Sequence, residues 1–245
     1  MKILYEDNHL IAAVKPAGVL SQGDKTGDAD MLTEVKKYLK EKYKKPGSAF
    51  VGLLHRLDRP VSGIMLFAKT SKGASRLSEQ FRNREVDKTY HALVTGKPSA
   101  QKGVLQNKLG KDEKLKKAKE YDDGDEARLY YEVIKSGKPF DSAQGGYSLL
   151  RITIEGGKFH QIRAQLSLAG LPIVGDVKYL PAGRQARAEW ENDLPAQAGK
   201  SIALCATGLS FKKATEDEMV DLVIQIPEEW GKYLIHSKGL DLKGK

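Results

Sequence analysis

Apolar residues along this chain follow two different patterns, and the first of them indicates β-strands. In six segments the apolar residues either run continuously or alternate with polar ones, which is typical of buried and half-buried strands respectively. These segments are residues 3–5, 10–14, 63–69, 89–94, 129–134 and 149–154. Turn-forming residues separate the first two, so we expect them to form a short hairpin.

The second pattern repeats apolar residues at spacings of three and four, which indicates helices. We expect the N-cap of the first helix at Asp28 or Asp30 and that of the second at Ser71, and Gly170 ends the third. The apolar faces are Leu32, Val35 and Leu39; Ala74, Leu77 and Phe81; and Ile162, Leu166 and Ala169. Helices and strands do not alternate regularly, so the chain is predicted to be α+β (mixed α/β), a largely antiparallel mixed sheet with flanking helices.

Two further segments lack a clear apolar pattern. Residues 96–128 are rich in lysines and acids and are predicted to form an exposed arm between two strands. Residues 181–199 contain prolines and glycines among alanines and glutamines and are predicted to form a flexible loop. With 245 residues, 40% of them hydrophobic, we expect a single domain over residues 1–245.

Composition adds a positive charge and removes several classes of protein. Lys and Arg number 41 against 32 Asp and Glu, a net charge of +9, which favours a polyanionic partner such as RNA without identifying it. No segment has the length and hydropathy of a membrane span, and the N-terminus lacks the pattern of a signal peptide, so we expect a cytoplasmic protein.

Cysteine and histidine usage argues against a structural metal. A single cysteine, Cys205, excludes an internal disulfide and is expected to be a small buried residue. The histidines show no paired metal-ligand spacing. They are His9, His55, His91, His160 and His236.

The most informative stretch for chemistry is Leu54–Gly63, which reads LHRLDRPVSG. Asp58 lies between Arg56 and Arg59, and a carboxylate beside two guanidiniums is expected to stay ionised. Pro60 cannot continue a helix, so Asp58 is predicted to lie in a loop that enters the apolar strand at residues 63–69. Taken alone, this pattern also fits a surface aspartate paired with an arginine.

Two later blocks add further candidate groups. Tyr90, in the block DKTYHA, offers a flat ring for stacking and a weak acid at its tip, although a strand tyrosine can also be purely structural. In the block GGKFHQIR, glycines precede a predicted helix whose free amides favour an anion. His160 and Arg163 are three residues apart and therefore lie on one side of its first turn.

These blocks resemble, in the same order, the motifs of the RluA-type pseudouridine synthases, which isomerise selected uridines in RNA. Two more blocks, GDVKY at residues 175–179 and IALCA at residues 202–206, resemble the later motifs of that family. The resemblance implies the pseudouridine synthase catalytic fold without the N-terminal S4 domain of many relatives. It also implies a monomer that acts on ribosomal or transfer RNA and needs neither cofactor nor metal.

The resemblance assigns roles to individual residues. Asp58 stands at the position of the catalytic aspartate, Tyr90 is expected to stack on the base and assist proton transfer, and Arg163 is expected to orient Asp58. Arg56 is expected to hold the flipped nucleotide or fill its space. Contacts with RNA are assigned to Arg56, His55, Lys158, His160 and Gln161.

The sequence leaves several alternatives open. Three positions differ from the residue that is common in relatives. Lys158 stands in place of an arginine, Cys205 in place of a histidine and Val61 in place of a threonine. A catalytically inactive RNA-binding or ribosome-assembly module would show the same motifs. A glycosidase would need a second carboxylate, and no acidic partner stands out near Asp58. Whether Asp58 attacks covalently or removes a ribose proton is also open.

Overall fold

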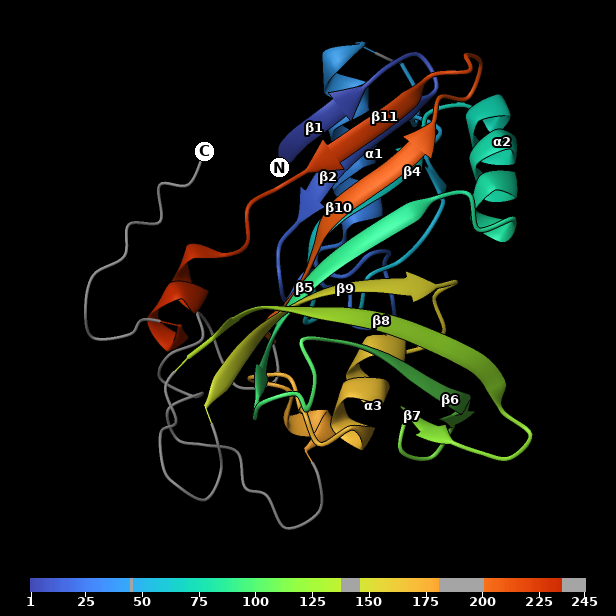
Figure 1. The fold of residues 1–245 in the computed structure, drawn as a ribbon. Helices are drawn as coiled ribbons and strands as arrows, with labels where there is room; N and C mark the ends of the chain where they lie inside the picture. Colours follow the sequence, from blue (N-terminus) through green and yellow to red (C-terminus); the bar gives the residue numbers. More distant parts are fainter. Residues whose placement is uncertain (45, 138–145, 181–200, 235–245) are drawn as a thin grey trace.

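The computed structural model describes residues 1–44, 46–137, 146–180 and 201–234 (Figure 1). Its strands are β1 (Lys2–Glu6), β2 (Leu10–Lys15), β3 (Gly52–Leu53), β4 (Ser62–Ala68), β5 (Asp87–Thr95), β6 (Lys102–Asp112), β7 (Lys117–Glu120), β8 (Asp125–Ser136), β9 (Tyr147–Glu155), β10 (Leu204–Lys212) and β11 (Met219–Val223). Its helices are α1 (Met31–Lys42), α2 (Ser71–Arg82) and α3 (Gln161–Leu168), with the 3₁₀ helices η1 (Val177–Tyr179) and η2 (Glu228–Tyr233).

Within the described residues, all of these strands belong to one sheet in the order β1-β2-β4-β10-β5-β9-β8-β6-β7, with β11 on β10 and β3 on β4. The pairs of named strands are antiparallel except for β4 and β10, which run parallel. The predicted α+β class with a largely antiparallel mixed sheet is therefore confirmed.

The parallel pair depends on a glycine. Gly63 lies opposite Ala206 and has φ 129°, a backbone conformation that L side chains rarely adopt. A Cβ atom at this position would lie 2.3 Å from the Ala206 carbonyl oxygen. Glycine therefore allows β4 to approach β10 directly after the Asp58 loop.

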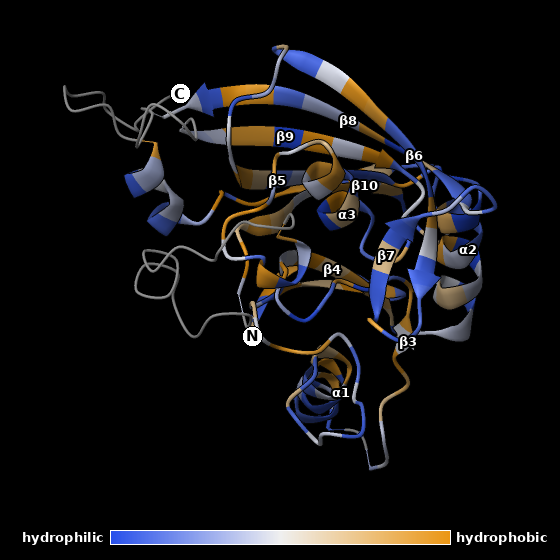
Figure 2. Ribbon diagram, turned by 90° about the horizontal axis from the view of Figure 1, so that it is seen from below, coloured by the Kyte–Doolittle hydropathy of each residue, from blue (hydrophilic) through white to orange (hydrophobic). Residues whose placement is uncertain are grey.

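The two faces of the sheet carry different helices. Ile11 of β2 packs in one core with Val35 of α1 and Leu166 of α3, whereas Leu10 packs in another core with Leu77 of α2. Since neighbouring strand residues point to opposite faces, α1 and α3 cover one face and α2 covers the other. The central strand β4 is predominantly hydrophobic and the outlying β7 is mostly hydrophilic (Figure 2).

Helix starts agree with the sequence to within one residue. The N-cap of α1 is Asp30 rather than Asp28, and its carboxylate accepts a hydrogen bond from Thr33 N at 3.0 Å. The N-cap of α2 is Thr70, whose hydroxyl accepts from Gly73 N at 3.1 Å, so the predicted cap at Ser71 is wrong by one position. Both residue types compete equally well for the role, and the sequence could not separate them.

The segment predicted to be an exposed arm, residues 96–128, contains β6, β7 and the start of β8, which extend the sheet by regular antiparallel pairing. Exposed and less exposed residues alternate along β6. Leu109 of β6 and Ala118 of β7 pack in a small buried cluster with Ala164 of α3. The predicted loop at residues 181–199 lies outside the described residues.

Among the helices that the structure describes, none is long and apolar enough to cross a membrane.

Candidate active site

Asp58 lies in the loop that leads into β4, and a buried lysine ties this loop to a second one. Lys15, which is fully buried at the end of β2, donates hydrogen bonds to the carbonyls of Pro16, Val19 and Arg59 at 3.1, 2.7 and 3.0 Å. Burial lowers the pKa of Lys15 to about 7, an effect that the charge of Asp58 opposes. The three bonds hold the residue after Asp58 against the loop that follows β2.

Arg163 of α3 connects Asp58 to a second carboxylate. Its Nη1 donates to Asp58 Oδ2 at 3.0 Å, and its Nε and Nη2 donate to the two oxygens of Asp176 at 2.7 and 2.8 Å. Burial acts to lower the pKa of Arg163, but the hydrogen bonds and charge of Asp176, together with Asp58, raise it overall. The guanidinium therefore stays charged and is held in one orientation by a two-pronged contact.

Asp176 is a site residue that the sequence analysis missed. It precedes η1, is 1% exposed, and accepts from Arg163 with both carboxylate oxygens. A signal was present, since an acid directly after Gly175 interrupts an otherwise apolar stretch, and a buried charge requires a partner. An acidic partner thus exists near Asp58, but it lies behind Arg163 and does not face the pocket as a glycosidase's second carboxylate would.

His160 approaches Asp58 from the N-cap of α3. Its backbone is left-handed with φ 52°, and its Nε2 lies 3.4 Å from Asp58 Oδ2. Its Nδ1 lies 2.8 Å from the Tyr179 hydroxyl, which also accepts a hydrogen bond from Ala118 N at 2.6 Å. The Tyr179 hydroxyl can donate to Nδ1 when the neutral ring carries its proton on Nε2, toward Asp58. Burial lowers the pKa of His160 to about 4.

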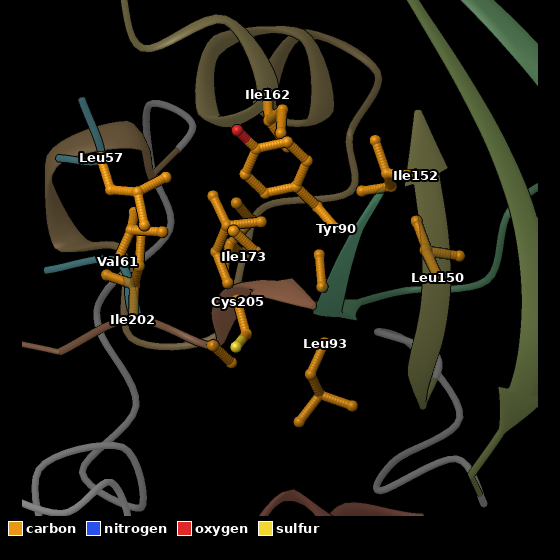
Figure 3. Packing of buried hydrophobic residues seen from close by; sticks show 14 of the residues in the cluster. Leu57, Val61, Tyr90, Leu93, Leu150, Ile152, Ile162, Ile173, Ile202 and Cys205 are labelled. Atoms are coloured by element: carbon orange, nitrogen blue, oxygen red, sulfur yellow. The ribbon is translucent and has the colours of Figure 1, made fainter. Parts of the chain in front are cut away.

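Tyr90 of β5 lies in the wall of the same pocket. Figure 3 shows its ring among Leu57, Ile152 and Ile162, with the hydroxyl oxygen directed toward Ile162. Burial, with the charge of Asp58, raises the pKa of Tyr90. The phenol therefore stays protonated and can donate a hydrogen bond, but it is not a base.

Two of the predicted RNA contacts are exposed to solvent near the pocket. Arg56 is exposed and makes no ion pair with any residue that the structure describes. Lys158 pairs with Asp125 at 2.8 Å, and both side chains are accessible, so RNA can replace that partner. Both residues line the cavity that contains Asp58.

Two other predicted contacts are engaged inside the protein. Gln161 is 2% exposed; its side chain accepts from Lys158 N and donates to Arg128 O and the Gln165 side chain. These bonds give Gln161 a supporting role for α3, and the geometry does not favour its predicted contact with RNA.

His55 is likewise engaged, since its Nε2 accepts from Leu66 N at 2.9 Å and its ring stacks on Phe81 at 5.1 Å. Burial lowers the pKa of His55 to about 4, and the charge of Lys88 acts in the same direction. The ring is therefore neutral and packed near neutral pH, which supports the loop rather than a contact with RNA.

These residues surround a cavity of about 90 Å³ at Asp58 and a wider groove of about 720 Å³ that leads away from it. The groove has more cationic than anionic side chains. Its cations are Arg56, Arg59, Arg82, Arg84, Lys88 and Lys158, against Asp24 and Asp58. No cluster of three His, Cys, Asp or Glu side chains suited to a metal ion occurs in the described part of the chain.

Cys205 lies in β10 and is 2% exposed. Burial raises the pKa of its thiol, so it is a small core residue as expected.

Comparison with known proteins identifies a family from the sequence and a shared fold from the structure. The family description "RNA pseudouridylate synthase" matches residues 9–168. Ribosomal large subunit pseudouridine synthase C of Rickettsia prowazekii is 34% identical over 180 residues, which cover 72% of this chain and 55% of that protein. tRNA pseudouridine synthase C of Haemophilus ducreyi is 34% identical over 185 residues, covering 73% and 74%. This chain thus spans about half the length of the first relative.

A solved structure, human RNA pseudouridylate synthase domain containing 4, has the same fold. It superposes with a TM-score of 0.73 at 24% sequence identity, covering 95% of this chain and 91% of the human one. The matched segment contains Asp58, Tyr90 and Arg163, which the structure brings to one pocket. With the expected motifs in order and the fold in common, this chain belongs to the RNA pseudouridylate synthase family.

Proposed function

We propose that this protein isomerises selected uridines in RNA to pseudouridine, with Asp58 as the reactive group. The observation that carries the proposal is the fixed contact from Arg163 to Asp58 at 3.0 Å, supported by the two bonds that Arg163 makes to Asp176. An oriented carboxylate beside a permanent positive charge suits a reaction in which charge develops at the sugar. Family membership supports the same reaction.

The reaction breaks the bond between C1′ and N1, turns the uracil and joins C5 to C1′. It therefore needs neither a redox cofactor nor nucleotide energy. A uridine within folded RNA has to leave its stack to reach a cavity of this kind. In our proposal the protonated Tyr90 stacks on the base and donates a hydrogen bond, Arg163 orients Asp58, and Arg56 holds the extruded nucleotide.

The substrate is proposed to be ribosomal or transfer RNA, since relatives are named for both. The cationic groove beside the pocket supports a contact with phosphates. We propose that the protein acts as a metal-free monomer in the cytoplasm, as the sequence led us to expect.

Site-resolved mapping of pseudouridine in RNA tests this proposal. RNA from a strain that lacks the protein is compared after complementation with wild type, Asp58→Asn or Asp217→Asn. Asp58→Asn keeps the size of the side chain but removes the charge, so modification should vanish while folding and RNA binding persist. Asp217→Asn, which removes an exposed carboxylate in the β10–β11 turn, is the matched control and should restore modification.

Two outcomes would overturn the proposal. Full modification with Asp58→Asn would remove Asp58 from the chemistry. Absence of modification with wild type, in RNA that the protein nevertheless binds, would favour the inactive RNA-binding module.

A further inference from the structure

A partly exposed aromatic ring at the rim of the active pocket has no role in the function proposed so far. Phe159 is 38% exposed and lines the wide groove. One of its faces stacks on His160 with ring centroids 3.9 Å apart and 18° between the planes. Since His160 is itself held by Tyr179, the phenyl ring is fixed in direction. Lys111 Nζ lies over the ring, 5.6 Å from its centroid, but the Lys111 side chain is exposed and pairs with the exposed Glu113, so a stacking base can displace it.

The C-terminal end of α2 borders the same groove and carries two exposed arginines. Arg82 makes no ion pair with the described residues, and the Arg84 side chain is 65% exposed with its nearest carboxylate, Glu155, at 3.8 Å. Lys88 donates to the carbonyl of Gly156 and so ties the start of β5 to the loop that precedes Phe159. The loop that carries Phe159 is therefore tied to the strand that follows the two arginines.

We propose that this part of the groove is a subsite for a nucleotide adjacent to the target uridine. Its base would stack on Phe159, and Arg82 and Arg84 would neutralise the phosphates that follow. A fixed aromatic ring that shares a groove with exposed cations is the arrangement that binds single-stranded nucleic acid, and stacking tolerates any base. The inference rests on the proposed function, because it takes the occupant of the main pocket to be a uridine in RNA.

Both features also have a purely structural interpretation. Arg82 lies in the last turn of α2, where a cation stabilises the helix through its dipole, and Phe159 shields His160 from water. Under that interpretation, substitutions would lower the melting temperature and leave contacts with RNA unchanged. A readout that follows the nucleotide directly separates the two.

The probe is a short single-stranded oligouridylate with one 2-aminopurine beside its central uridine, measured by fluorescence quenching and anisotropy. Phe159→Ala should abolish quenching on binding and weaken affinity on the order of tenfold, whereas Phe159→Tyr should retain both. Arg82→Gln with Arg84→Gln should weaken affinity and reduce the slope of log affinity against log salt by about one to two.

The matched control lies on the same helix. Lys72→Gln with Arg76→Gln removes two exposed cations that line a separate groove beside the β10–β11 turn. This variant should keep the affinity, the salt slope and the rate of pseudouridine formation of the wild type. Equal losses from both double variants would show a general effect of charge and overturn the subsite.

The subsite is also overturned if Phe159→Ala retains quenching, or if the wild type does not bind the oligouridylate at low salt. Failure of the proposed function has a different signature. If the wild type forms no pseudouridine but quenching depends on Phe159 and affinity on Arg82 and Arg84, the subsite stands and the catalytic assignment falls.

Discussion

The charged groups of the active pocket and those of the adjoining groove are arranged in opposite ways. Arg163 and Asp176 are 5% and 1% exposed and satisfy one another with two hydrogen bonds. At the far end of the groove, Arg84 is 65% exposed and Arg82 has no ionic partner among the described residues. In the active pocket the ionic contacts are already formed within the protein. In the groove the arginines remain accessible to a ligand.

The difference follows from the cost of removing a charge from water. A buried ion pair gains little net stability, because desolvation offsets most of its attraction, so its value lies in the fixed geometry it gives Asp58. An exposed arginine costs almost nothing when it is unpaired, and it gains free energy when RNA releases its counterions. The charges with fixed positions therefore lie next to Asp58. The exposed charges lie along the groove, where they can attract RNA.

Replacing Arg163 should have the largest effect on stability and turnover. Arg163→Ala leaves Asp176 buried without its partner, so the free energy of unfolding should fall by about 3–5 kcal/mol. Turnover should fall on the order of 100-fold or more, because Asp58 loses its oriented charge. RNA affinity of the folded protein should change little, as measured by filter binding beside single-turnover kinetics.

A double variant separates stability from chemistry. Arg163→Met with Asp176→Leu removes both buried charges and should recover much of the lost stability while turnover stays low. Loss of RNA binding with normal turnover per bound RNA would instead assign Arg163 to the RNA backbone.

Asp176→Asn should give a smaller effect of the same kind. The amide keeps the shape of the side chain but weakens the contact with Arg163, so stability should fall by about 1–3 kcal/mol. Turnover should also decrease, since Arg163 becomes free to turn away from Asp58. Chemical denaturation and single-turnover kinetics give the two values, and unchanged turnover of the folded fraction would limit Asp176 to a structural role.

The pH dependence of protein stability tests whether His160 is a buried neutral residue. Its pKa is lowered from 6.5 to about 4 by burial in the folded protein, so the unfolded chain binds more protons between these values. Stability should therefore decrease as pH falls from about 6.5 to 4. His160→Gln should flatten this decrease by about one proton in urea denaturation across that window, and curves parallel to the wild type would contradict the buried neutral ring.

Arg56 should give the smallest effect, because its contact with RNA is exposed and screened. Affinity of the wild type for RNA should fall steeply as salt rises from low to physiological levels. Arg56→Gln should reduce the slope of log affinity against log salt by about one, with no change in the melting temperature. Binding that is insensitive to salt in the wild type would contradict the electrostatic role of the groove.

Local features of this fold were accessible from the sequence. The strand β4 and the Asp30 cap follow from patterns within a few residues, and the loop position of Asp58 follows from Pro60 and the apolar run after it. The contact between Arg163 and Asp58, 105 residues apart, was expected only through the resemblance to a family. Spacing alone places Arg163 on the first turn of α3 but does not show what that turn faces.

Contacts set by packing were not accessible. The pairing of Asp176 with Arg163 depends on how η1 lies against α3, and the three carbonyl partners of Lys15 depend on two loops meeting. A lysine that directly continues an apolar strand was a usable hint of burial. The strands β6 and β7 were not predicted because each has a single buried residue, Leu109 and Ala118, so no apolar pattern marks them in the sequence.

The position of β10 in the sheet determines when the site can form during folding. This strand is formed by residues 204–212, yet it lies between β4 and β5, which come from residues 62–68 and 87–95 (Figure 1). Until β10 inserts, the two halves of the sheet have open edges, and the Asp58 loop lacks the strand against which Gly63 packs. Such pairing over long sequence separation slows folding, so residues up to Lys212 must have left the ribosome before the catalytic pocket exists.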